Sequence, residues 1–231
     1  MTRLTFDRPI LLAGGGTLTP DMLQDARQVA EALGGLAAIV AADGAADALD
    51  ALGARPDVIV GDLDSLGDPE RWRREGVPVL HLAEQDTTDF EKCLYSVNAP
   101  LYLAAGFTGR RTDHMLAVLH VLLVRRAQRV VLIGEEEVMA LAPPERVLTM
   151  DLGAGARVSI YPLVPLRCAP SAGLVWPVDG LTLAPGRQVG TSNIAAEDRV
   201  SLRFEDPGAL LMLERHALPA LVSALMADDT S

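Results

Sequence analysis

Residues 56–65 read Pro-Asp-Val-Ile-Val-Gly-Asp-Leu-Asp-Ser, a short β-branched run that ends in two carboxylates. The run at 58–60 is typical of a buried strand. Helical patterns lie on both sides of it, at Ala45–Leu52 and Asp68–Glu75. Strands that alternate with helices in this way predict a parallel sheet with crossover helices.

The alternation continues in both directions from this strand. The other strands predicted in the first half are Pro9–Ala13, Leu36–Ala41, Val77–Leu80, Leu101–Ala104 and Val130–Ile133. The other predicted helices are Pro20–Leu33, which Thr19 caps, Asp89–Val97 and Asp113–Arg126. We therefore predict an N-terminal α/β domain with a parallel sheet over residues 1–142.

The sequence changes in character after Pro143-Pro144, where short apolar runs are separated by Gly and Pro turns. This pattern predicts an antiparallel β-sandwich domain over residues 145–231. Its predicted strands are Val147–Met150, Arg157–Tyr161, Leu181–Leu183, Val200–Phe204 and Leu210–Leu213. A terminal helix is predicted over Ala217–Met226, followed by a frayed tail at Asp228–Ser231.

Acidic residues outnumber basic ones, with 31 Asp and Glu against 20 Lys and Arg, and the formal net charge is −11. Such a chain has no net positive field to attract a nucleic-acid backbone. No apolar stretch has the length of a signal or membrane-spanning helix, and the two cysteines, Cys93 and Cys168, form no disulfide framework. We expect a cytoplasmic protein with no nucleic-acid or membrane partner, and a buried structural thiol at Cys93.

Polar residues follow four successive predicted strands, at the sheet edge where parallel sheets bind ligands. They are Asp43-Gly44, the pair Asp62 and Asp64, the segment Gln85–Asp89, and the loop Gly106–His114. Clustered carboxylates repel one another, and Mg²⁺ would relieve that repulsion because it prefers oxygen ligands and bridges to phosphates. The two acids of Asp-x-Asp face one site if the strand continues and diverge if the loop turns. Solvated loop acids are the alternative, because turns favour Asp.

Lys92 is the only lysine in a chain with 19 arginines. A position that keeps lysine against this bias indicates a need for a compact point charge, as in contacts with phosphate. The alternative is a solvated surface lysine. Lys92 follows Asp89 by one helical turn, which favours the phosphate interpretation.

The segment Gly109–His114 opens a predicted helix and contains two arginines. Backbone N–H groups at a helix start attract anions, so this segment predicts a phosphate-binding loop. A favourable first-turn acid at Asp113 and a structural histidine at His114 are the alternatives. The run Gly14–Gly16 lacks the spacing of a dinucleotide fingerprint, and we interpret it as a turn.

The motifs form an ordered series along nearly the whole chain. In the first half they are Asp43-Gly44, Pro56-Asp57, Gly61-Asp62-x-Asp64-Ser65, Asp86-x-Thr88-Asp89-x-Glu91-Lys92 and Gly109-x-Arg111-x-Asp113-His114. In the second half they are Gly173-Leu174-Val175-Trp176-Pro177 and Gly190-Thr191-Ser192-Asn193. Each motif is modest by itself, but the series is specific and resembles the thiamine pyrophosphokinase family.

That resemblance implies a homodimeric enzyme that transfers the pyrophosphoryl group of ATP to the hydroxyl of thiamine, giving thiamine diphosphate and AMP with Mg²⁺. It implies that the first domain binds ATP and the metal, and that the β-domain helps to bind thiamine. The catalytic residues that it implies are Asp62, Asp64, Asp89 and Lys92, and the three acids are also the implied metal ligands. The nucleotide-binding residues that it implies are Asp43, Gly44, Gln85, Thr88, Arg111, Asp113 and His114. The implied thiamine-binding residues are Trp176, Ser192 and Asn193, with ordinary core packing as the alternative for Trp176.

The chain departs from the family pattern at four positions. Ala45 and Arg110 stand where the family usually has glycine, Val118 stands near the place of an asparagine, and Ile194 replaces a polar residue. Arg110 bears on nucleotide preference, whereas Val118 and Ile194 bear on the contacts with thiamine. Ala45 matters only if its backbone needs a positive φ.

Two other functions fit part of the pattern. A phosphatase of the haloacid-dehalogenase type would use Asp62 as nucleophile and Asp64 as acid, but Gly61 interrupts the apolar run before the nucleophile and the later motifs have no role. A sensor that binds thiamine or nucleotide without catalysis is the second alternative. The retained acids and Lys92 argue against it, because a pure binder does not need a costly charge cluster.

Overall fold

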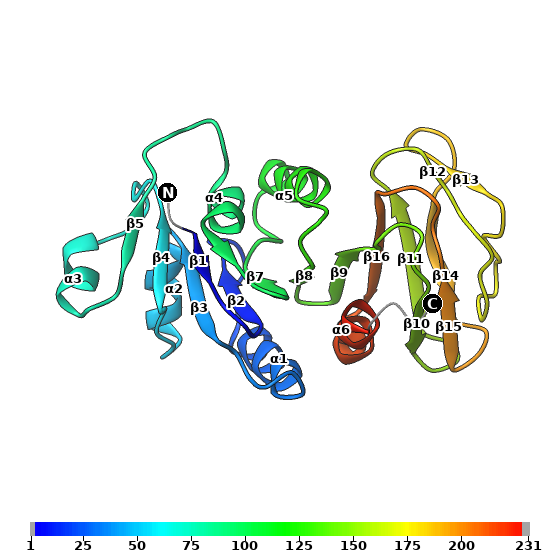
Figure 1. The fold of residues 1–231 in the computed structure, drawn as a ribbon, viewed down its shortest axis with the longest axis horizontal. Helices are drawn as coiled ribbons and strands as arrows, with labels where there is room; N and C mark the ends of the chain where they lie inside the picture. Colours follow the sequence, from blue (N-terminus) through cyan, green and yellow to red (C-terminus); the bar gives the residue numbers. More distant parts are fainter. Residues whose placement is uncertain (1–2, 228–231) are drawn as a thin grey trace. The chain divides into compact units, whose positions relative to one another are not determined.

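The computed structural model describes residues 3–227. The chain forms two compact units that divide between Glu135 and Glu136, called unit 1 and unit 2 below (Figure 1). The predicted mixed α/β fold is confirmed. The tail predicted at Asp228–Ser231 lies outside the described residues.

Unit 1 contains a parallel sheet with the strand order β8-β7-β2-β3-β4-β5. Its strands are β2 (Ile10–Ala13), β3 (Ala38–Ala42), β4 (Val58–Gly61), β5 (Val79–His81), β7 (Tyr102–Ala105) and β8 (Val130–Ile133). All six were predicted from their apolar runs, and all except β5 are fully buried, as expected of parallel strands covered by helices. Two short strands, β1 (Leu4–Thr5) and β6 (Val97–Asn98), pair with each other and were not predicted.

The five predicted helices of unit 1 are all present, and three of them begin after a capping side chain. They are α1 (Pro20–Glu31), α2 (Ala45–Ala51), α3 (Pro69–Arg74), α4 (Asp89–Ser96) and α5 (Thr112–Val124). The side chains of Thr19, Asp68 and Thr88 accept hydrogen bonds from backbone N–H groups in the first turns of α1, α3 and α4. These caps fix where α1, α3 and α4 begin, whereas α2 and α5 have no side-chain cap.

The strand order of unit 1 reverses between β2 and β7, because the chain proceeds outward from β2 through β5 and then returns to β7 on the other side. Such a reversal opens a crevice at the carboxyl ends of the strands. The loops Gly14–Gly16 and Gly106–Gly109 meet there, and the N–H of Gly16 donates to the carbonyl of Gly106 at 2.6 Å. A Cβ on Gly14 would lie 2.5 Å from that carbonyl oxygen, so the close approach requires glycine.

Unit 2 is built from antiparallel strands and ends in helix α6 (Leu218–Met226), preceded by a 3₁₀ turn, η1 (Arg215–Ala217). The order β14-β11-β16-β9 forms one sheet, and β10-β15 and β12-β13 form separate pairs. The bounds are β9 (Glu137–Leu141), β10 (Leu148–Asp151), β11 (Arg157–Pro162), β12 (Leu166–Arg167), β13 (Thr182–Leu183), β14 (Gly190–Ile194), β15 (Arg199–Leu202) and β16 (Ala209–Glu214).

Strand β9 was not predicted, because it begins with the last of three consecutive glutamates, which mask its short apolar stretch. It pairs with β16 and belongs to unit 2. The sequence places the division after this strand, at Pro143-Pro144. Cys93 and Cys168 are both buried and free, as expected of a structural thiol at Cys93. Within residues 3–227, no helix is long and apolar enough to cross a membrane.

Candidate active site

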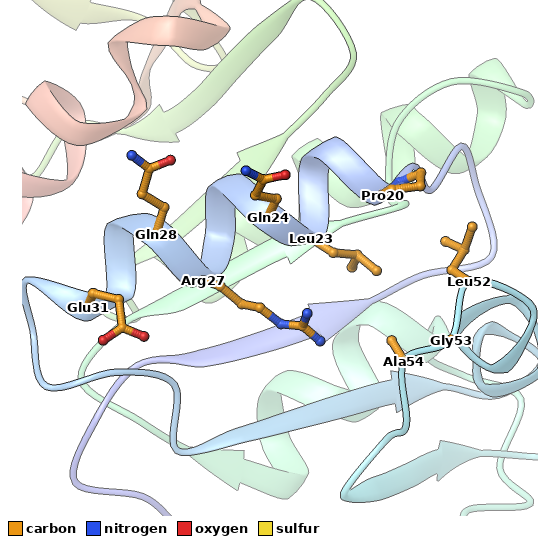
Figure 2. Close-up of a pocket in the computed structure, with 9 residues that line it drawn as sticks. All are labelled: Pro20, Leu23, Gln24, Arg27, Gln28, Glu31, Leu52, Gly53 and Ala54. Carbon is orange, nitrogen blue, oxygen red and sulfur yellow. The ribbon is translucent and has the colours of Figure 1, made fainter.

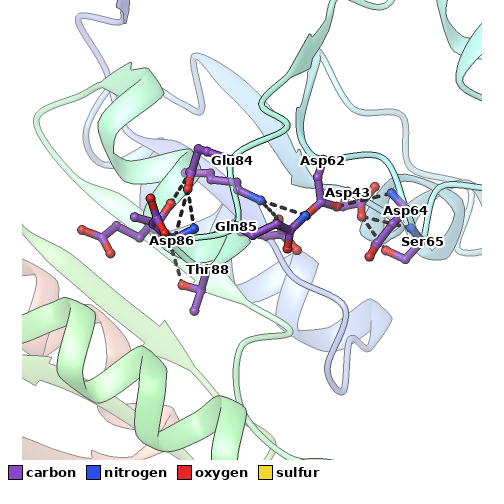
Figure 3. A network of polar contacts seen from close by, with 12 residues as sticks. Asp43, Asp62, Asp64, Ser65, Glu84, Gln85, Asp86 and Thr88 are labelled. Atoms are coloured by element: carbon purple, nitrogen blue, oxygen red, sulfur yellow. Dashed lines mark hydrogen bonds and ion pairs between the residues drawn. The ribbon is translucent and has the colours of Figure 1, made fainter.

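Three carboxylates converge at the carboxyl ends of β3 and β4. Asp43 follows β3, and Asp62 and Asp64 follow β4 (Figure 3). One carboxylate oxygen from each residue lies within 4.8 Å of the other two. The Asp-x-Asp pair therefore faces one site, and we call Asp43, Asp62 and Asp64 the carboxylate cluster.

Asp43 is held in place by the loop that follows β4. Its backbone has a left-handed φ of 48°, which Asp tolerates better than most residues. Its Oδ2 accepts hydrogen bonds from the Ser65 hydroxyl at 2.7 Å and from the Ser65 N–H at 3.2 Å. A Cβ on Gly61 would lie 2.8 Å from the Cβ of Asp43, so the glycine before Asp62 makes room for this side chain.

Lys92 is buried beside the carboxylate cluster, with 1% of its side chain exposed. Its Nζ lies 3.0 Å from Asp62 Oδ2 and 3.4 Å from Asp89 Oδ1. The alternative of a solvated surface lysine is therefore wrong. Burial disfavours the ammonium, but the bonds to Asp62 and Asp89 outweigh it and raise the pKa of Lys92.

The acids around Lys92 occupy different electrostatic environments. The hydrogen bond from Lys92 lowers the pKa of Asp62. Burial raises the pKa of Asp89, and the negative charge of Asp62 raises the pKa of Asp64. The site thus has more negative than positive charge, and its donors are oxygen atoms of the kind that Mg²⁺ prefers. These residues fit a magnesium ion.

The loop between β5 and α4 brings further predicted residues to the site. The amide of Gln85 donates to Asp62 Oδ2 at 2.9 Å, and Thr88 caps α4, the helix that carries Asp89 and Lys92. The loop is shaped by Glu84, which sequence reasoning missed. Glu84 accepts hydrogen bonds from the N–H groups of Asp86 and Thr87, and from the hydroxyls of Thr87 and Tyr95.

These bonds, chiefly the one from the Thr87 hydroxyl, lower the pKa of Glu84 to about 2. A carboxylate whose pKa is lowered in the folded state stabilises the fold when the pH lies above its ordinary pKa. That contribution disappears as the pH falls toward the lowered pKa of the folded state. We expect Glu84→Gln to lower the urea midpoint at about pH 7, and the difference from wild type to shrink at about pH 3. Urea denaturation at both pH values measures this, with Glu197→Gln as an exposed control. A constant difference at both pH values would contradict the assigned role.

Arg111, Asp113 and His114 lie at the start of α5, as predicted. The guanidinium of Arg111 bonds to the carboxylate of Asp113 at 2.6 and 3.1 Å, and both side chains are mostly exposed. His114 is also exposed. The structure shows no contact between the described side chains of this group and the carboxylate cluster.

Two of the three departures from the family pattern in unit 1, Ala45 and Arg110, can be placed in the structure, whereas nothing in the structure explains Val118. Ala45 is the first residue of α2 and does not have a positive φ, so alanine fits without strain. Arg110 adopts a left-handed φ of 49°, and its guanidinium donates to the carbonyl of Gly15 at 3.2 Å. Arg110 therefore links the two glycine loops at the crevice.

The predicted thiamine-binding residues come together in unit 2. Trp176, Ser192 and Asn193 line a cavity of about 400 Å³, with apolar walls that include Val178 and Leu183. Trp176 is 57% exposed, so the alternative of ordinary core packing is wrong. The Asn193 amide donates to the backbone carbonyl of Trp176 at 2.7 Å and accepts from its N–H at 3.2 Å, and thereby holds the backbone that carries the indole.

Unit 1 contains a hollow of about 540 Å³ that lies along α1 and beside residues 52–54 (Figure 2). Its charged lining side chains are Arg27 and Glu31. None of its lining residues belongs to the predicted site, and we assign it no role.

Residues 30–133 match the family described as thiamin pyrophosphokinase, catalytic domain. Thiamine pyrophosphokinase 1 of Oryza sativa subsp. japonica is 30% identical over 165 residues, which cover 64% of this chain and 62% of that protein. The chain therefore spans less than two thirds of the length of the curated relatives that it matches.

Solved structures show the same fold. Thiamin pyrophosphokinase from Geobacillus thermodenitrificans has a TM-score of 0.71 at 23% identity, covering 89% of this chain and 96% of that chain. Yeast thiamin pyrophosphokinase has a TM-score of 0.73 at 18% identity, covering 92% and 88%.

Proposed function

We propose that this chain, a member of the thiamine pyrophosphokinase family, transfers the pyrophosphoryl group of ATP to the hydroxyl of thiamine, giving thiamine diphosphate and AMP. The observation that carries the proposal is the convergence of Asp43, Asp62 and Asp64, with Lys92 buried beside them. This arrangement lies in the segment that matches the family's catalytic domain.

Residues of unit 1 would bind the nucleotide and the metal. Mg²⁺ held by Asp62, Asp64 and Asp89 would supply charge neutralisation for the phosphates of ATP. Lys92 and Arg111 would add positive charge toward the same phosphates. The remaining residues that we assign to the nucleotide are Asp43, Gly44, Gln85, Thr88, Asp113 and His114.

Phosphoryl-type transfer depends on positioning and charge more than on covalent help from the protein. A carboxylate at the site, Asp62 or Asp89, would accept the proton of the thiamine hydroxyl or orient that hydroxyl. Gln85 would keep Asp62 in place through the bond to its Oδ2. The proposal extends to a homodimer that works in the cytoplasm, with unit 2 folded as a β-sandwich.

The cavity in unit 2 would bind thiamine. Thiamine is a cation, and an exposed indole offers it a cation–π contact. Ser192 and Asn193 lie beside Trp176 along this cavity. The apolar walls suit an aromatic ligand.

The direct test is incubation with ATP, Mg²⁺ and thiamine, with AMP, ADP and phosphate resolved in the presence and absence of thiamine. Thiamine-dependent AMP together with thiamine diphosphate is the expected result. ADP or free phosphate would contradict the proposal and indicate a kinase or a phosphatase. Binding of thiamine without any product would indicate a sensor.

We expect Trp176→Ala to raise the KM for thiamine roughly tenfold, because it removes the cation–π contact. The KM for ATP should stay within about twofold of wild type, since the assigned nucleotide residues lie in unit 1. Val147→Ala, an exposed apolar position of unit 2, is the matched control. Equal effects on both KM values would argue against a thiamine site at this cavity.

A further inference from the structure

Asp43 is the most constrained acid of the carboxylate cluster. Only 1% of the residue is exposed, and its backbone is left-handed. Glycines make room for it and for its partner, because a Cβ on Gly61 would meet Asp43 and a Cβ on Gly44 would lie 2.6 Å from the carbonyl of Ser65. The local sequence is thus arranged around a buried carboxylate.

The two oxygens of this carboxylate have different environments. Oδ2 accepts both hydrogen bonds from Ser65. Oδ1 is buried and has no hydrogen-bond partner among the described residues. A buried carboxylate oxygen without a partner is unfavourable unless a ligand satisfies it. The neighbouring oxygens of Asp62 and Asp64 are also negative, so that ligand is a cation.

We infer that Asp43 is a direct ligand of the divalent cation, together with Asp62 and Asp64, and that the cation occupies this cluster before the nucleotide binds. The inference rests on the proposed function and deepens it, since that function places Asp43 only among the nucleotide-binding residues. Oxygen donors from three carboxylates suit Mg²⁺ or Mn²⁺.

Asp89 lies outside the carboxylate cluster. It shares Lys92 with Asp62, but it is not among the acids whose oxygens gather within 4.8 Å of one another. We therefore do not count Asp89 among the ligands that hold the ion without nucleotide. The family resemblance groups Asp43 and Asp89 the other way, with Asp89 among the metal ligands and Asp43 among the nucleotide-binding residues.

The test is a titration of the whole chain with Mn²⁺ alone, without ATP or thiamine, followed by electron paramagnetic resonance. Wild type is expected to bind one ion. Asp43→Asn should weaken the affinity at least roughly tenfold, and Asp89→Asn should change it by less than about threefold. Wild-type affinity in Asp43→Asn, an equal loss in Asp89→Asn, or no binding by wild type would each overturn the inference.

A thermal melt separates ligation from a structural role. Asn keeps the shape of Asp43 and retains an acceptor for Ser65, so Asp43→Asn without metal should melt at or above the wild-type temperature. The rise in melting temperature caused by Mn²⁺ should shrink in Asp43→Asn and persist in Asp89→Asn. An undiminished rise in Asp43→Asn would overturn the inference, whatever the stability of the metal-free variant.

Failure of this inference differs from failure of the proposed function. The Mn²⁺ titration contains neither substrate, whereas the proposed function is read from thiamine-dependent AMP formation by wild type. Wild type that forms AMP while Asp43→Asn binds Mn²⁺ normally would remove only the inference. Wild type that binds Mn²⁺ through Asp43 but forms no AMP would remove only the proposed function.

Discussion

Asp64→Asn is expected to lower thiamine-dependent AMP formation by roughly 100-fold or more, because it removes one charged ligand of the proposed metal ion, which would neutralise the phosphates. The side chain of Asp64 is exposed, and its backbone N–H, which the substitution keeps, donates to Asp62. The fold should therefore be unaffected, with a melting temperature within about 2 °C of wild type. Initial rates over a range of Mg²⁺ concentrations, together with a thermal melt, measure both expectations.

The matched control for this variant is Asp7→Asn, the same change at a side chain that is 91% exposed and lies in unit 1. It should leave the rate unchanged. If Asp64 is a direct metal ligand, Asp64→Asn should also need a higher Mg²⁺ concentration to reach its half-maximal rate. Full activity of Asp64→Asn at saturating Mg²⁺ would count against a direct role for this carboxylate.

The fold of unit 1 was largely predictable because its local signals agree with one another. Thr19 with Pro20, and Thr88 before Asp89, mark helix starts through capping chemistry that acts over only three residues. The buried strands consist of short continuous apolar runs, as parallel strands require. Local patterns of this kind do not depend on distant contacts, so the sequence alone suffices to find them.

The features that the sequence did not reveal depend on long-range contacts. The bond between Asp43 and Ser65 joins positions 22 residues apart, and the Gly14–Gly16 loop meets Gly106 across the crevice. Glu84 looks like any loop acid until Tyr95 and Thr87 are placed around it. The run Gly14–Gly16 after β2 was the available signal for the crevice. The sequence alone does not show that the strand order reverses beside it, so the run could be interpreted only as a turn.

Composition and burial together mark Lys92 as a candidate functional cation. Its rarity in the sequence indicated a special position, and the structure places it, almost fully buried, between Asp62 and Asp89. A buried ammonium requires partners of opposite charge, and here both partners are proposed catalytic acids. The ammonium of Lys92 therefore links the carboxylate cluster to the helix that carries Asp89.

We expect Lys92→Arg to lower AMP formation about 100-fold although the charge is retained, because a displacement of about 1 Å at a reacting group has an effect of this size. The guanidinium is larger and planar, and a side chain with 1% exposure has no room for it unless α4 or Asp62 moves. Lys92→Met should have a different signature. It leaves Asp62 and Asp89 unpaired and should lower the free energy of unfolding by about 2 kcal/mol, less than for a fully buried pair because Asp89 is 39% exposed.

Initial rates and urea denaturation of both Lys92 variants measure these effects, and Arg129→Lys, an exposed exchange between the same residue types, is the control. The two variants differ in a useful way. If Lys92→Arg loses activity while its free energy of unfolding stays close to the wild-type value, the lysine is assigned to the phosphates. The charge is then still present, but its position has changed. Wild-type rates in Lys92→Arg would mean that any cation suffices at this position, and the single lysine of the chain would then have no catalytic meaning.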